Sequence, residues 1–131
     1  MDIFIIIAGF AVSAFTAFAF FKAGKFKATS SKEVLLQAGF GWIEKIPFGV
    51  VRLIAWLEIL GAIGVVVAPI GYLLGFEWAI WFAIAAAIGL ALTMVGAIWV
   101  HAARGETKYT LKMNLNLLVA SVVTALSWFA L

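Results

Sequence analysis

The sequence predicts an all-α fold: a membrane four-helix bundle with a short interfacial helix between its first two membrane helices. Of the 131 residues, 66% are hydrophobic and 11% charged, whereas about 25% charged residues is usual in a soluble domain. Four long apolar runs use nearly the whole chain, and a bilayer core about 30 Å thick takes about 20 helical residues. Because each run is continuously apolar, helices are favoured over the alternating strands of a barrel.

These observations predict one transmembrane domain over residues 1–131. Its membrane helices are expected at about residues 3–22, 48–68, 78–102 and 112–131. Between the first two, Ser30 and Glu33 have the spacing of a capping box, and Gly39 supplies a stop. A short helix is therefore expected there, at the membrane interface. Pro47 fits the start of the second membrane helix, where its missing N–H costs nothing.

All nine basic residues fall in or beside the first and third connections. They are Lys22, Lys25, Lys27, Lys32, Lys45, Arg52, Arg104, Lys108 and Lys112. Because Lys and Arg concentrate on the cytoplasmic side of a membrane protein, we expect both termini outside and the chain in the cytoplasmic (inner) membrane. This basic belt favours contact with anionic lipid in the bilayer. No basic-aromatic pattern accompanies it, so no nucleic-acid partner is expected.

Composition also limits the chemistry of the chain. The absence of cysteine excludes disulfides, thiolate catalysis and iron–sulfur ligation by this chain, and His101 is the single histidine. We therefore expect no metal site and no covalent cofactor. Any redox role would have to be supplied by a partner.

Glu58 is the only acid inside an apolar run. A carboxylate in the middle of a membrane helix costs about 2.5–3.5 kcal/mol on insertion scales, so it should be protonated, paired or facing a polar cavity. On a helix it shares a face with small residues such as Ala55 and Ala62, which let another helix approach. Two interpretations stay open: a carboxyl that ties helices together, or a ligand or proton site.

Polar residues on the other helices reach a depth similar to that of Glu58 when the helical rise is counted from each helix end. They are Ser13, Thr93 and Ser121. We expect them to be hydrogen-bond partners of Glu58, with Met94 on the inward face of the third helix. A second polar layer is expected nearer the inner surface. It comprises Arg52, His101, Asn114 and Asn116.

His101 is predicted to lie roughly 15 Å from Glu58 along the membrane normal. A direct pair is therefore not expected unless a helix bends, and water or a ligand would have to span the gap. The alternative role of His101 is that of an interfacial residue that complements the C-terminus of its helix.

Two segments carry a family resemblance. Arg52–Gly64 reads RLIAWLEILGAIG, and Ala87–Glu106 reads AIGLALTMVGAIWVHAARGE. Together they resemble the DoxX-like family of small four-helix membrane proteins. The positions that match its pattern are Gly24, Lys27, Glu58, Leu60, Gly61, Met94, Ala97 and His101. Ala55 stands where the family often has glycine, a departure that would narrow a pocket.

The resemblance implies a role without defining it, because the family is named after a subunit of a thiosulfate:quinone oxidoreductase and some relatives are linked to membrane oxidoreductases. Our leading hypothesis is a non-catalytic subunit that binds a lipophilic ligand, a quinone or lipid, with Glu58 as its polar anchor. Its partner would be a membrane oxidoreductase or another membrane complex, and the chain would not be an enzyme on its own.

Two alternatives are kept. In one, the chain is a quinone-linked oxidoreductase subunit in which Glu58 and His101 relay protons. In the other, less favoured, it is a small proton-coupled transporter. Small multidrug-resistance proteins also have four helices and an intramembrane glutamate, but theirs lies in the first helix. Four helices would need to assemble as a homo-oligomer to form such a pathway.

Overall fold

The computed structural model describes residues 2–131, apart from the side chains of Thr107 and Tyr109. Its elements are α1 (Ile3–Thr29), α2 (Lys32–Gln37), the 3-10 helix η1 (Gly41–Lys45), α3 (Phe48–Leu73), α4 (Ala79–Ala103) and α5 (Thr107–Phe129). Over the described residues there is no strand, and α1, α3, α4 and α5 are long and apolar enough to cross a membrane. The predicted all-α membrane bundle is confirmed.

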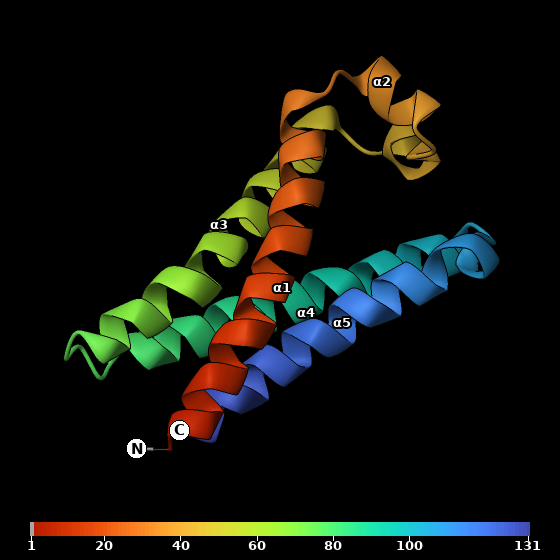
Figure 1. Cartoon of the computed structure of the whole chain (residues 1–131). Coiled ribbons are helices and arrows are strands. Elements are labelled where there is room, and N and C mark those ends of the chain that lie inside the picture. Colours follow the sequence, from red (N-terminus) through yellow and green to blue (C-terminus); the bar gives the residue numbers. More distant parts are fainter. Residues whose placement is uncertain (1) are drawn as a thin grey trace.

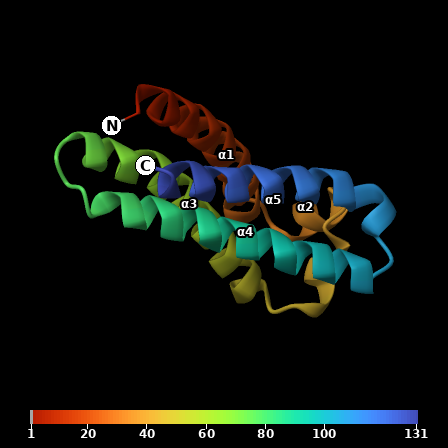
Figure 2. The same ribbon diagram turned by 90° about the horizontal axis from the view of Figure 1, so that it is seen from below.

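The four long helices form two antiparallel pairs. α1 packs along α3 and α4 packs along α5, while α3 also contacts α4 and α1 contacts α5. Figure 1 shows that the pairs are inclined to each other, and Figure 2 shows the same arrangement from below. They meet near the two chain termini, which we call the terminal end. They diverge toward the α2–η1 segment and the α4–α5 turn, which together we call the basic end.

α1 is longer than the sequence predicted. It continues beyond residue 22 to Thr29, because the inward spacing that includes Phe20 and Gly24 is maintained at Lys27, and all three are buried. The helix stops only at Ser30, whose backbone is extended. Lys27 is therefore part of a membrane helix and does not belong to the first connection.

The short helix α2 lies where the sequence placed one, but its cap is shifted by one residue. Ser31, and not Ser30, accepts a hydrogen bond from the Val34 N–H at 3.2 Å. Gly39 follows the helix with a φ of 96°, a conformation that glycine adopts without strain. Leu35, Ile43 and Val51 form a buried apolar cluster that fixes α2 and η1 against the start of α3.

The other bounds differ less from expectation. α3 begins directly after Pro47 but passes through Pro69 and ends at Leu73, where the sequence suggested a stop near residue 68. Proline is tolerated inside membrane helices because neighbouring groups satisfy the backbone that it frees. α5 begins at Thr107, about one turn before the predicted residue 112.

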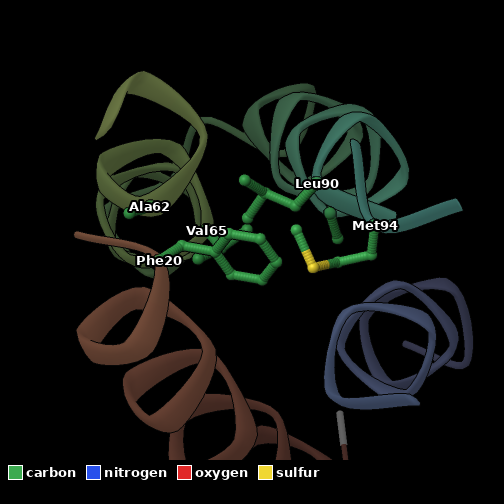
Figure 3. Packing of buried hydrophobic residues seen from close by; sticks show 6 residues of the cluster. Phe20, Ala62, Val65, Leu90 and Met94 are labelled. Carbon is green, nitrogen blue, oxygen red and sulfur yellow. The ribbon is translucent and has the colours of Figure 1, made fainter. Parts of the chain in front are cut away.

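The centre of the bundle is apolar. Its main buried cluster consists of Phe20, Ala62, Val65, Ala87, Leu90 and Met94. Figure 3 shows Phe20, Leu90 and Met94 pointing into the space between the helices. A second cluster nearer the terminal end is built around Trp128, whose indole packs edge-on against Phe10 with ring centroids 5.2 Å apart.

Polar contacts join α1 to α5 inside the bundle. Trp128 Nε1 donates a hydrogen bond to Ser13 Oγ at 2.9 Å, and the hydroxyls of Thr16 and Thr124 are bonded at 3.0 Å. All four residues are buried. Such hydrogen bonds between helices stabilise association in a membrane, where apolar burial gives helices little reason to leave the lipid.

Close approach of α1 to α3 depends on Gly24. A Cβ at this position would lie 2.8 Å from the Ala55 carbonyl oxygen and 2.9 Å from the Ile59 side chain. Backbone oxygen cannot move aside without shifting a helix, so a side chain here would push α1 away from α3.

We expect Gly24→Ala to lower the free energy of unfolding by about 1–3 kcal/mol, the usual cost of overpacking. The matched control is Gly96→Ala on α4, where a Cβ would meet nothing within 4 Å. This control should be neutral or stabilising, since alanine favours a helix over glycine. Reversible unfolding in detergent measures both, and equal effects at the two glycines would contradict the close packing of α1 on α3.

Candidate functional site: a buried ion pair between α1 and α3

Glu58 lies in the interface between α1 and α3. The residue is 1% exposed, and Ala55, Ala62 and Val65 of the same helical face are buried with it. Its Oε1 is 2.5 Å from Nζ of Lys27, which is 8% exposed. A carboxylate and an ammonium thus form an ion pair inside the apolar part of the bundle.

Helix geometry explains why Lys27 reaches Glu58. Lys27 lies in the last turn of α1, and side chains of a helix lean toward its N-terminus. The long stem therefore leans away from the basic end and back into the bundle. Gly24, one turn earlier, brings the backbones close, since a Cβ there would be 3.2 Å from the Glu58 Cβ.

Arg52 of α3 holds the turn that carries Lys27. Its Nη1 donates hydrogen bonds to the carbonyl oxygens of Lys27, at 3.1 Å, and of Ala28. These carbonyls belong to the last turn of α1, where intrahelical partners run out. The guanidinium also lies 4.5 Å from the centroid of the Phe48 ring, a cation–π contact. Arg52 therefore caps α1 and is a positioning residue for Lys27.

The ion pair leaves one acceptor unused. Glu58 Oε2 is buried and has no hydrogen-bond partner among the described residues, and the same is true of Asn114 Nδ2 on α5. A buried polar atom left without a partner costs about 1–3 kcal/mol. Such atoms are rare in folded proteins, so Oε2 marks a position where a donor group would be stabilised.

The hydrogen-bond partners predicted for Glu58 were wrong, because each is bonded elsewhere. Ser13 accepts from Trp128, Thr93 Oγ1 donates to the Gly89 carbonyl oxygen at 2.9 Å, and Ser121 Oγ donates to that of Leu117 at 2.7 Å. Equal depth along the membrane normal does not bring side chains together when the helix pairs diverge.

His101 and its neighbours form a separate polar cluster at the α4–α5 turn. His101 Nδ1 is 3.1 Å from Glu106 Oε1, which also accepts a hydrogen bond from Arg104 Nε at 2.8 Å. The structure thus pairs His101 with Glu106, while Glu58 is paired with Lys27. Burial of Glu106 is slight, and the pKa of its carboxyl lies below the ordinary value because of the hydrogen bonds with His101 and then Arg104.

The remaining predicted site residues are dispersed. Met94 is buried in the apolar core, and Asn114 is buried on α5. Asn116 is exposed, so it does not join an inward polar layer with Asn114. Arg52 is half-buried and bonded to α1. The predicted inner polar layer is therefore not one connected group.

Two apolar grooves open on the outer surface of the bundle. One of about 330 Å³ lies between α1 and α5, lined by Ile5, Ala8, Val123, Leu126, Ser127 and Ala130. The other, of about 260 Å³, lies between α1 and α3, lined by Ala17, Phe18, Phe21, Ala62 and Ile63. The second belongs to the same helix interface as Glu58, since Ala62 follows Glu58 by one helical turn, about 6 Å along the axis.

No group of three or more metal-ligating side chains occurs in the part of the chain that the structure describes. The chemistry available at the ion pair is that of a carboxylate acceptor and an ammonium donor, which can bind and orient a polar group in apolar surroundings.

Lys27 is the site residue that our sequence reasoning missed as a partner of Glu58. The signal was present, because the buried positions of α1 keep a spacing of three or four residues up to Lys27. A basic residue on the inward face of a helix that continues past Phe21 could have been matched to the one intramembrane acid.

Comparison with known proteins gives one match. The model of the DoxX-like family matches residues 11–128, nearly the whole chain. No curated protein and no solved structure matches the chain.

The ion pair generates a stability prediction. Lys27→Met should lower the free energy of unfolding by about 3–5 kcal/mol, because it leaves the Glu58 carboxylate buried without its partner. The double change Lys27→Met/Glu58→Leu should recover most of that loss, since an apolar pair of similar size is often tolerated as well as an ion pair. Unfolding of the wild type, both single variants and the double variant measures the coupling. Additive losses would show that the two side chains do not interact.

The cluster at the α4–α5 turn generates a pH prediction. Because folding lowers the pKa of Glu106 from its ordinary value of 4.5, its contribution to stability is present above that value. It should be lost as the pH falls through the lower pKa of the folded protein. Melting temperatures measured from neutral pH to below 4.5 should therefore fall more in the wild type than in Glu106→Gln. Glu44→Gln, at an exposed acid of η1, is the control and should keep the wild-type profile.

Proposed function

Since the chain belongs to the DoxX-like family, we propose that it is a membrane subunit that binds a lipophilic molecule, a quinone or a lipid, between α1 and α3. Glu58 is the polar anchor of that ligand. The apolar body of the ligand lies in the groove that Phe18, Phe21 and Ala62 help to line. The chain acts with a membrane oxidoreductase or another membrane complex and is not an enzyme on its own.

One observation carries this proposal: Glu58 Oε2 has no partner among the described residues, although the residue is 1% exposed. A pocket that binds an apolar molecule needs few polar groups, placed where they fix its orientation. The neighbouring groove supplies the apolar surface. Its lining residue Phe18 is 72% exposed, so in a bilayer the groove is open to molecules that dissolve in lipid.

The basic end supports the other part of the proposal, the contact with a partner and the inner-membrane location. Lys22, Lys25, Lys32 and Lys45 are exposed there, around α2 and η1. With this end in the cytoplasm and both termini outside, these ammonium groups meet anionic lipid head groups or an acidic partner surface. The proton-relay alternative has less support, because Glu58 and His101 each pair with a different residue.

The test is retention of a lipophilic molecule through purification. Protein extracted in mild detergent should retain a quinone or lipid that mass spectrometry detects in the organic extract. Lys27→Met/Glu58→Leu should retain at least about tenfold less, the equivalent of one hydrogen bond to a charged group. Glu77→Gln, at an exposed acid of the α3–α4 turn, is the matched control and should retain as much as the wild type. Equal retention by the double variant would contradict the proposed site.

A further inference from the structure

We infer that the head group bound at Glu58 is a neutral hydroxyl, as in a long-chain alcohol, a hydroxylated lipid or a quinol, and not the carbonyl of a quinone. This inference rests on the proposed function and deepens it. It follows from the hydrogen-bonding capacity that the ion pair leaves over, from its charge balance and from the groove beside it.

The unused atom of Glu58 requires a donor. A carboxylate accepts hydrogen bonds and donates none. Oε1 is occupied by the Lys27 ammonium, whereas Oε2 is buried and has no partner among the described residues. A ketone, ester or ether oxygen can only accept, so it would leave Oε2 unpaired. A hydroxyl or an N–H group satisfies it.

The other half of the pair offers donors. A lysine ammonium carries three N–H bonds, and among the described residues the hydrogen bond of Lys27 Nζ goes to Glu58 Oε1. A ligand oxygen beside the pair can therefore accept from Nζ. A hydroxyl donates to Oε2 and accepts from Nζ through the same atom, which an N–H group cannot do.

The charges of the pair are already balanced. Glu58 and Lys27 carry opposite charges 2.5 Å apart in a buried position, so a charged ligand would add an uncompensated charge to apolar surroundings. Such burial is strongly unfavourable. Fatty acids, phosphates and amines are therefore disfavoured, which leaves the neutral hydroxyl.

The groove between α1 and α3 sets the form of the rest of the ligand. It is about 260 Å³ in volume, and its side chains are all apolar, from Ala17, Phe18, Phe21, Ala62 and Ile63. Ala62 lies about one turn from Glu58, so a hydroxyl at the ion pair can be continuous with an apolar chain in the groove. Oε2 is enclosed in this structure, and entry requires that side chains along the interface move apart.

Two matched pairs of probes test the inference with purified wild-type protein. The first pair is hexadecanol and its methyl ether, and the second is a decyl-substituted benzoquinol and the corresponding quinone. Native mass spectrometry measures the bound fraction of each. Within a pair, the hydroxyl compound should bind at least about tenfold more tightly, the effect of one hydrogen bond to a charged group.

The probes also separate the sources of the hydroxyl and the two levels of the argument. A preference confined to the first pair identifies an alcohol or hydroxylated lipid, and one confined to the second identifies a quinol. Equal binding within both pairs overturns the hydroxyl inference and leaves the proposed function intact. If none of the four compounds binds, the proposed function fails, and the inference fails with it.

Variants locate the preference. In Lys27→Met/Glu58→Leu it should fall to about twofold or less, and in Glu77→Gln it should stay at the wild-type level. A preference that persists in the double variant would overturn the inference. If the double variant does not fold, a photoreactive analogue of hexadecanol is used on wild-type protein. It should label peptides that contain Phe18 or Ala62, and labelling confined to other helices would overturn the inference.

Discussion

The ion pair between Lys27 and Glu58 is the interaction on which the α1–α3 half of the bundle depends. Neither charge would be stable alone in this apolar setting, because removal of an ion from water costs several kcal/mol. Together they are neutral, and their 2.5 Å contact requires the backbones to approach at Gly24. Arg52 meets the same requirement from the opposite side, since it binds the carbonyls of the turn from which Lys27 extends. Three residues of different chemistry thus satisfy one constraint.

α1 connects the two helix pairs through contacts of different kinds along its length. Toward the basic end it is held to α3 by the ion pair, and toward the terminal end to α5 by the Thr16–Thr124 and Ser13–Trp128 hydrogen bonds. A helix that contacts one neighbour at each end lies across the bundle, which agrees with the inclination of the pairs in Figure 1. The polar groups of the chain are therefore distributed among separate contacts and do not form one continuous network.

This distribution gives the two polar centres different characters. At the α4–α5 turn, His101, Arg104 and Glu106 bond one another near the surface. In the α1–α3 interface, the pair is buried and its hydrogen bonding is incomplete at Oε2. A buried acceptor without a donor is costly and is usually explained by a strained, catalytic or ligand-binding role. Incomplete bonding next to a lipid-facing groove is the feature that distinguishes Glu58 from a carboxyl that merely ties two helices.

The sequence by itself determined the all-α membrane class, the inward faces of the helices and the unusual position of Glu58. These depend on hydropathy, on helical periodicity and on the cost of a charge in lipid, all of which are local properties of a segment. Only the tertiary structure decided the partners: Lys27 for Glu58, Glu106 for His101 and Trp128 for Ser13. Depth along each helix can be counted from sequence, but the side chains that meet at that depth depend on which helices pair, how they are inclined and how far each one extends. That is why equal depth failed to predict the hydrogen bonds of Ser13, Thr93 and Ser121, and why seven further residues of α1 were enough to bring a lysine to the acid.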